Sequence, residues 1–192
     1  DHIDKLTKTY NLDQDYSPYE ERGLFLEGTS SLVMDRMNKI AYMGISPRSN
    51  LELAEKWSEI NGYTLIPFET KSHTGGAIYH SDVMMYIGTS LAVVCEDSIA
   101  NGKNEVIESL GKTHQLMFIT ESQLLDFCGN CIEVKDNENR LCLVMSSKAV
   151  AGYDNAQIKT LNQFYDRIIH SDLTTIENHG GGSARCMIME LY

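Results

Sequence analysis

The chain has 192 residues, of which 42% are hydrophobic and 22% are charged, a balance that suits a globular domain and excludes a disordered chain. Sixteen lysines and arginines against 27 aspartates and glutamates give a net charge of −11 without a cationic cluster, which argues against a nucleic-acid partner. No apolar run approaches the roughly 20 residues of a membrane span, so no membrane association is expected. The acidic balance is compatible with a small cationic ligand.

A polar lead-in is expected over residues 1–23, with a short apolar strand following over 23–28. The order strand, strand, helix, strand is then predicted three times, at a spacing of roughly 50 residues. The elements of the three sets are expected at 31–34, 39–43, 50–60 and 63–68, then at 83–88, 91–95, 104–110 and 115–119, and finally at 131–134, 141–145, 155–169 and 173–176. This order predicts an α/β fold of repeated units that pack together, and it argues against a single doubly wound sheet.

The cysteines are odd in number and irregular in spacing, which does not suit a disulfide framework and predicts a reducing, cytoplasmic location. Two of them, Cys128 and Cys131, form a C-x-x-C pair. A structural zinc site would need a second ligand pair at matching spacing, and none is present. A thioredoxin-like pair would open a helix, whereas Cys131 leads into a strand-like segment. We therefore expect no metal site and no cofactor.

The C-terminal region carries the densest chemical signal, a glycine run over 180–182 followed by Arg185 and Cys186. Glycines allow the backbone to approach a ligand closely, and a neighbouring cation lowers the pKa of a thiol and favours the nucleophilic thiolate. An apolar strand is expected directly after Cys186, over 187–189. The alternative interpretation is a glycine turn followed by a buried cysteine in a strand.

Two further places carry residues that suit acid–base chemistry or anion binding. His80 and Asp82 stand two residues apart, which would place both on one face of a strand as a general acid–base group beside a carboxylate. Glu27 ends the first predicted strand, and Arg48 lies in a loop where it could bind a carboxylate bidentately. Taken singly, each of these residues also fits an ordinary structural role at a strand end, a turn or the surface.

Taken together, Glu27, Arg48, the His80–Asp82 pair and Cys186 follow one another in an order that resembles the guanidino-group-modifying superfamily. That superfamily includes arginine deiminases, dimethylarginine dimethylaminohydrolases, agmatine deiminases and amidinotransferases. The resemblance is closer to its bacterial citrulline-utilisation hydrolase and amidinotransferase-like branch. The stretches that carry it run from residue 24 to the C-terminus: LEGTSSLVMDR, AYMGISPRSN, AIYHSDVMMYIGT, FCGNCIEV and GGGSARCMI.

The resemblance implies a pseudo-fivefold α/β propeller of ββαβ modules around a central substrate channel. It implies Cys186 as the nucleophile, His80 as the general acid–base and Glu27 as the acid that contacts the substrate or orients the site. Asp82 would hold the guanidinium or ureido nitrogens, and Arg48 would bind the substrate carboxylate. Asn130 and Arg185, in the matching stretches FCGNCIEV and GGGSARCMI, are expected to contribute to substrate binding.

The chain departs from the family pattern in sequence and in length. The usual Glu-Gly-Gly-Asp is Glu-Gly-Thr-Ser at 27–30, and Pro47 replaces a common glutamate. About three modules are recognised where a propeller needs five, so residues 1–192 are expected to be the C-terminal portion of one catalytic domain. A missing N-terminal segment or a partner chain would then supply the remaining modules.

The predicted function is a cysteine-dependent hydrolase of a guanidino or ureido amino acid, such as arginine, citrulline or a methylated arginine. It would act through a covalent thiouronium-type intermediate. Two alternatives stay open at this point. One is an amidinotransferase that passes the amidino group to an acceptor amine, and the other is a non-catalytic fragment that binds guanidino compounds. A homodimer is possible on the basis of the resemblance.

Overall fold

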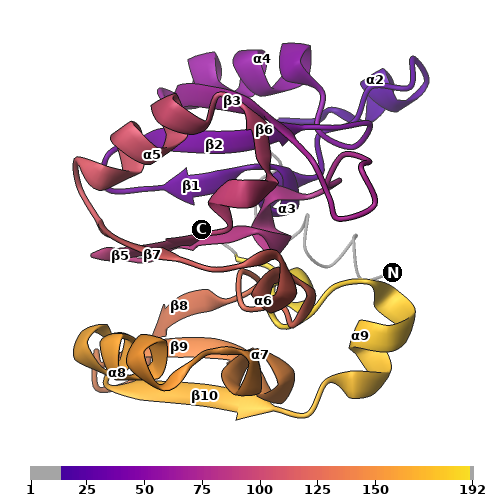
Figure 1. The fold of residues 1–192 in the computed structure, drawn as a ribbon. Coiled ribbons are helices and arrows are strands. Elements are labelled where there is room, and N and C mark those ends of the chain that lie inside the picture. Colours follow the sequence, from indigo (N-terminus) through magenta and orange to yellow (C-terminus); the bar gives the residue numbers. More distant parts are fainter. Residues whose placement is uncertain (1–13, 191–192) are drawn as a thin grey trace.

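The computed structural model describes residues 14–190, so most of the predicted lead-in over 1–23 lies outside it. Its strands form three small sheets that follow one another through the molecule in chain order (Figure 1). The short helix α2 (Ser17–Glu20) precedes the first sheet. In each sheet the first two strands are antiparallel and the third joins the second in parallel after a helical crossover. The predicted order strand, strand, helix, strand is thus observed in all three.

The first sheet contains β1 (Val33–Asp35), β2 (Ile40–Ile45) and β3 (Thr64–Thr70), and helix α4 (Leu51–Asn61) connects β2 to β3. Asn50 caps α4 by accepting a hydrogen bond from the backbone N–H of Leu53 at 3.2 Å. The helix ends at Gly62, whose φ of +67° is the left-handed conformation that glycine adopts without strain. Local signals therefore set both ends of this helix.

The second sheet contains β4 (Met85–Ile87), β5 (Leu91–Val94) and β7 (Gln115–Phe118), with helix α5 (Lys103–Gly111) before β7. One strand of this segment, β6 (Ile99–Asn101), leaves it and pairs with β3 as the fourth strand of the first sheet. Helix α5 contacts both sheets, and the hydroxyl of its Ser109 lies 2.7 Å from the Tyr42 hydroxyl of β2. The first two sheets are therefore interlocked.

The third sheet contains β8 (Ile132–Lys135), β9 (Leu141–Ser146) and β10 (Arg167–Ser171). Helix α6 (Glu121–Leu125) precedes it, and its crossover holds α7 (Ser147–Gly152) and α8 (Asn155–Phe164). Helix α9 (Thr174–Gly180) and the short 3-10 turn η3 (Arg185–Met187) follow. In Figure 1 the chain after α9 returns from the third sheet towards the middle of the molecule.

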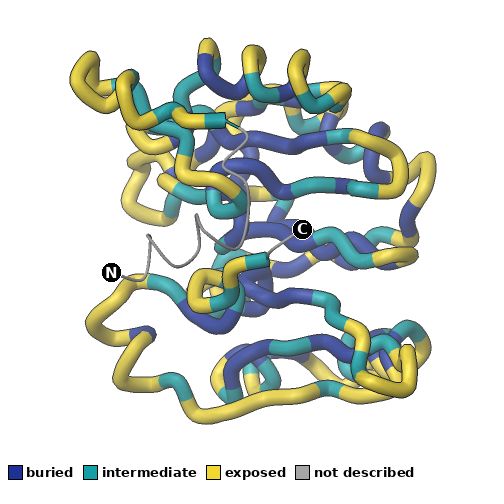
Figure 2. Tube along the Cα trace, turned by 180° about the vertical axis from the view of Figure 1, so that it is seen from behind, coloured by how far each residue is buried: buried dark blue, intermediate teal, exposed yellow. Residues whose placement is uncertain are grey.

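One main hydrophobic cluster draws on all three sheets. It includes Tyr42 and Phe68 from the first sheet, Met85 from the second, and Leu143 and Met145 from the third. Figure 2 shows this buried interior along the inner strands, whereas loops, outer helix faces and the edge strand β10 are largely exposed. A smaller cluster lies under α4 and is formed by Leu32, Ala41, Met43 and Ala54. Burial of this apolar area is the main stabilising contribution to the packing of the sheets on one another.

Four sequence-based assignments of elements are wrong in whole or in part. The predicted strand over 23–28 is only an isolated bridge between Leu26 and Ser49, followed by the one-turn helix α3 (Gly28–Ser31). The predicted helix over 155–169 ends at Phe164, and the strand lies at 167–171 rather than at 173–176, where α9 begins. The expected strand over 187–189 is absent, because η3 extends to Met187 and residues 188–190 pair with no strand.

Candidate active site

Five short segments at the ends of these elements carry the predicted site residues. Glu27 is the N-cap of α3, and Arg48 lies in the loop after β2. We expected His80 and Asp82 to lie on one face of a strand, but neither residue belongs to a strand. His80 instead stands at the N-cap position of the 3-10 turn η1 (Ser81–Val83) without a side-chain capping bond. The turn contains Asp82 and contacts both α3 and η3. Cys186 lies in η3, beside Asp82.

Glu27, His80 and Arg48 form one polar cluster at the surface. The Oε2 atom of Glu27 lies 2.5 Å from Nε2 of His80 and accepts a longer hydrogen bond of 3.5 Å from Nη1 of Arg48. The His80 side chain is 22% exposed and that of Arg48 is 55% exposed. The carboxylate therefore orients the imidazole, as an acid partner does in a catalytic pair, while the arginine remains open to solvent.

Three buried serines that we did not single out in the sequence hold these segments together. The Ser81 hydroxyl donates to the carbonyl of Ser31 at 3.1 Å and accepts from the backbone N–H of Gly44 at 2.8 Å. The Ser49 hydroxyl donates to the Ser31 hydroxyl at 2.7 Å, and the Ser31 hydroxyl accepts from the backbone N–H of Glu27 at 3.0 Å. Their position in the sequence could have indicated this role, since Ser49 follows Arg48 and Ser81 lies between His80 and Asp82.

Asp82 is buried in the site and lies beside the exposed Cys186. The Cys186 thiol donates to Oδ2 of Asp82 over 3.6 Å, and Oδ1 of this 2% exposed carboxyl group has no hydrogen-bond partner. Burial raises the pKa of Asp82 to about 6, against the attraction of Arg185 and His80. A buried carboxylate with a free oxygen beside a thiol is suited to receive a planar cation.

The pKa of Cys186 is raised, which is contrary to our expectation from its neighbour Arg185. Burial has the largest effect and the negative charge of Asp82 adds to it, while a hydrogen bond from Asn130 opposes them. The Arg185 guanidinium is turned away, since Nη2 lies 2.8 Å from Glu190 Oε2 and Nη1 donates to the Ile188 carbonyl at 2.9 Å. Although Arg185 precedes Cys186 in the sequence, its guanidinium therefore does not contact the Cys186 thiol.

Asn130 connects the segments around the thiol and is fully buried. Its Nδ2 donates to the Asp82 carbonyl at 2.9 Å and to Sγ of Cys186 at 3.1 Å. Its Oδ1 accepts from the backbone N–H groups of Ser183 and Arg185, both at 3.1 Å. These contacts show how Asn130 positions the thiol, while the contact with substrate that we expected of it stays a prediction.

The C-x-x-C pair belongs to this packing. Gly129 lies so close to η1 that an added Cβ would meet the Val83 carbonyl oxygen at 2.6 Å. Cys128 and Cys131 are buried, and burial raises the pKa of Cys128 to about 12 and that of Cys131 further still. Within residues 14–190, no group of three or more histidine, cysteine or acidic side chains could hold a metal ion.

The glycine run before Cys186 contains one position where a side chain would act directly on the thiol. A Cβ at Gly182 would lie 2.8 Å from Sγ and 2.9 Å from Cβ of Cys186. We expect Gly182→Ala to displace Cys186 and to slow its alkylation by iodoacetamide about 10-fold or more. Gly180→Ala is the matched control, because a Cβ there meets only Ile176, at 3.7 Å. Equal alkylation rates in the two variants would contradict the expected displacement.

Comparison with known proteins agrees with this architecture. The family model for N,N dimethylarginine dimethylhydrolase, eukaryotic, matches residues 1–192. The N-terminal domain of ArgZ, an arginine dihydrolase from the ornithine–ammonia cycle in cyanobacteria, has a similar fold in a mutant bound to substrate. The two share 16% sequence identity with a TM-score of 0.69, over 85% of this chain and 56% of that one.

Two other solved structures are similar. An ArgZ N-terminal domain variant covalently bound to a reaction intermediate gives a TM-score of 0.66 at 17% identity, over 84% of this chain and 55% of that one. The dimethylarginine dimethylaminohydrolase (DDAH) of Pseudomonas aeruginosa, as a mutant complexed with citrulline, gives 0.54 at 18% identity, over 80% and 51%. This chain thus spans just over half of each of these solved chains. No curated protein sequence matches it significantly.

The fold and the family match define a member of the guanidino-modifying superfamily. Within this superfamily, the chain belongs to the N,N dimethylarginine dimethylhydrolase family, whose model its whole length matches. None of the helices in the described part of the chain has the length and hydropathy of a membrane span.

Proposed function

We propose that this chain carries the catalytic residues of a cysteine-dependent hydrolase that acts on the guanidino or ureido group of an amino acid. The observation that carries the proposal is the buried Asp82 carboxyl group, which has an unpartnered oxygen and lies 3.6 Å from the Cys186 thiol. A guanidinium group that pairs with this oxygen would bring its central carbon next to Sγ. Binding and nucleophilic attack then use adjacent atoms.

In the proposed reaction the Cys186 thiolate adds to the planar carbon of the substrate. His80, oriented by Glu27, protonates the leaving amine as the carbon–nitrogen bond breaks, and a thiouronium-type adduct remains on Cys186. Water then attacks the adduct while His80 removes its proton, and the carbon–sulfur bond breaks to release the thiolate and a ureido product. A ureido substrate would pass through the corresponding thiocarbamate and release a carbamate. In the described part of the chain His80 contacts Glu27, whereas Cys186 contacts Asn130 and Asp82, an arrangement that suits a substrate lying between His80 and Cys186.

Substrate charge supplies the activation that the free site lacks. In the unliganded site, burial and Asp82 raise the pKa of Cys186, so the neutral thiol is favoured. A bound guanidinium would neutralise Asp82 and place a positive charge next to Sγ, and both effects lower the pKa of the thiol. The reactive thiolate would thus form mainly when substrate is present.

Arg48 is the proposed contact for the substrate carboxylate. Its exposed guanidinium lies at the outer side of the site, and within residues 14–190 its contact is the 3.5 Å hydrogen bond to Glu27 that was described above. An α-amino acid could therefore extend from Asp82 outwards to Arg48. The similar solved structures support this class of ligand, since ArgZ was crystallised with its substrate and the Pseudomonas aeruginosa DDAH with citrulline.

The larger assembly is part of the same proposal. The three sheets with one common strand order are consistent with modules of a pseudo-fivefold α/β propeller, of which residues 1–192 would form the C-terminal portion. We propose that the full catalytic channel includes further modules, from the same chain or from a partner, and that the enzyme works in the cytoplasm. All five cysteines being free agrees with a reducing location.

Product analysis tests the proposed reaction. The protein, in its longest natural form, would be incubated separately with L-arginine, N-methylated arginine and L-citrulline, with and without an added acceptor amine. We expect one of them to release ammonia or an alkylamine, to yield an unchanged product in the presence of the acceptor, and to leave a transient adduct on Cys186 that mass spectrometry detects. An amidino product on the acceptor would instead identify a transferase, and the absence of both release and adduct would reject the proposal.

A further inference from the structure

The cation nearest to Asp82 does not pair with it. Arg185 attracts the Asp82 carboxylate more strongly than any other charged group, while His80 and the Cys186 thiol also face this carboxylate. Nevertheless, no ion pair joins Arg185 to Asp82 in the described structure, and Oδ1 of Asp82 keeps no partner. In a buried site two such opposite charges would normally pair, so something must hold them apart.

The guanidinium of Arg185 is held by the C-terminal end of the described chain. Glu190 accepts from Nη2 of Arg185 at 2.8 Å, and the Ile188 carbonyl accepts from Nη1 at 2.9 Å. The Arg185 side chain is only 12% exposed, so few other solvent-facing positions are open to it. Both of its terminal nitrogens therefore have acceptors other than the Asp82 oxygen that lacks a partner.

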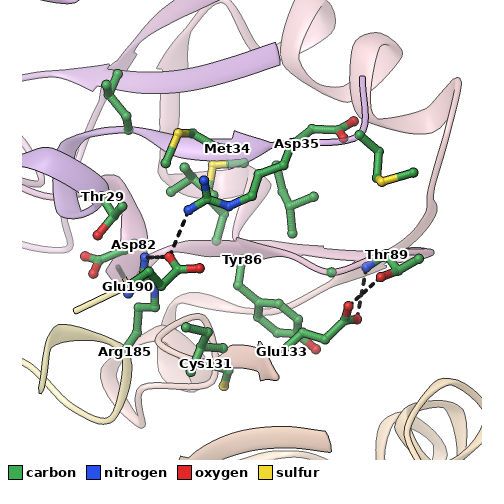
Figure 3. A pocket seen from close by; sticks show the side chains of 18 residues that line it. Thr29, Met34, Asp35, Asp82, Tyr86, Thr89, Cys131, Glu133, Arg185 and Glu190 are labelled. Carbon is green, nitrogen blue, oxygen red and sulfur yellow. Dashed lines mark hydrogen bonds and ion pairs between the residues drawn. The ribbon is translucent and has the colours of Figure 1, made fainter. Parts of the chain in front are cut away.

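Glu190 is itself fixed from the opposite wall of a cavity. Its Oε2 atom accepts a second hydrogen bond, of 3.1 Å, from Nη2 of Arg36, which follows β1. Figure 3 shows Arg185 at the Glu190 carboxylate, with Asp82 beside them. These four side chains line a cavity of about 250 Å³. A single carboxylate thus joins the segment that carries Cys186 to the first sheet.

From this geometry we infer that Glu190 is a positioning residue that keeps Arg185 away from Asp82 and so leaves Asp82 free to bind the substrate cation. The inference rests on the proposed function, because an unpaired Asp82 carboxylate has a role in binding only when the ligand is a cation. Without Glu190, Arg185 would turn to Asp82 and form the pair that the substrate is meant to form. Substrate binding would then have to displace an internal cation.

The experiment measures the titration of Asp82 without any ligand, by carbon NMR of its carboxyl group, assigned by the signal that is lost in Asp82→Asn. In Glu190→Ala we expect the pKa of Asp82 to fall by about 1 to 3 units, because a paired arginine favours the ionised form. Glu190→Gln, which keeps the shape, should show a smaller fall. In the double variant Glu190→Ala with Arg185→Leu the fall should vanish, because the competing cation is absent.

Glu138→Gln is the matched control, since it also removes a glutamate–arginine contact, that of Glu138 with Arg140 at 3.0 Å, in the exposed β8–β9 turn. It should leave the titration of Asp82 unchanged. An unchanged pKa in Glu190→Ala, or a fall that persists in the double variant, would overturn the inference.

Calorimetric titration with L-arginine gives the second measurement. Glu190→Ala should weaken binding at least 10-fold, and the control Glu138→Gln should leave it unchanged. A protein that binds none of L-arginine, N-methylated arginine and L-citrulline but shows the expected change in the Asp82 titration would reject the proposed function and retain the role of Glu190.

Discussion

Cys186→Ser should abolish covalent labelling of the protein by an α-haloacetamidine, and in the complete enzyme it should lower turnover by about 10⁴-fold or more. The reagent combines a guanidinium-like head with an alkylating carbon, so Asp82 should bind the head next to Sγ of Cys186. Serine has nearly the same shape, but its hydroxyl stays protonated where a thiol can ionise. Intact-mass measurement followed by peptide mapping gives the extent and the position of the label.

The other cysteines provide the control for this experiment. Cys95, Cys128, Cys131 and Cys142 are all buried, whereas Cys186 is exposed. Cys142→Ala should therefore label as fully as the wild-type protein. Labelling that is spread over several cysteines, or that persists in Cys186→Ser, would show that Cys186 is not the nucleophile.

Asp82→Asn should make the folded protein more stable at neutral pH while removing its affinity for guanidinium compounds. The pKa of Asp82 is raised from the ordinary 3.8 to about 6, a difference that corresponds to about 3 kcal/mol of destabilisation by the ionised form. Asparagine carries no charge but leaves its own amide to satisfy, so we expect a net gain of about 1 to 3 kcal/mol. Urea unfolding of the ligand-free protein measures it.

The gain should depend on pH in a defined direction. Between about pH 4 and pH 6 the folded wild type binds more protons at Asp82 than the unfolded chain does, so its stability falls as the pH rises through this window. The difference between Asp82→Asn and wild type should therefore be small at pH 4, grow up to about pH 6.5 and then stay constant. A difference in unfolding free energy that does not change with pH would mean that burial does not raise the pKa of Asp82.

Asp154→Asn is the matched control, because it makes the same substitution at an exposed aspartate. Asp154 caps α8 by accepting from the backbone N–H of Gln157 at 2.8 Å, and asparagine caps helices equally well. Its stability should therefore stay within about 0.5 kcal/mol of wild type at each pH.

The parts of the fold that the sequence predicted are those that local signals determine. The helix over 51–61 is set by its Asn50 cap and the Gly62 that ends it, and the hairpins by apolar runs on either side of short polar turns. The strand β10 was mistaken for the end of a helix because its Ile168 and Ile169 also fit a helical spacing. Only their pairing with Leu143 and Val144 of β9, more than 20 residues away, makes this segment a strand.

The candidate site divides in the same way. Residue types and their order indicated Glu27, His80, Asp82 and Cys186, and the structure brings them together in two contacting pairs. The orientation of Arg185 could not be predicted, because it depends on Glu190 and on a partner 154 positions earlier in the chain. Contacts between distant segments leave no pattern in the local sequence.

The position of β6 has a consequence for how the domain could be divided or rebuilt. The strand belongs by sequence to the second unit and by hydrogen bonding to the first sheet, while α5 directly after it packs on both. No cut between residues 70 and 99 therefore yields two complete pieces, because one piece would lose its edge strand. Units that look like separate repeats along the chain would unfold together, and transplanting one of them into another protein would carry an unpaired edge with it.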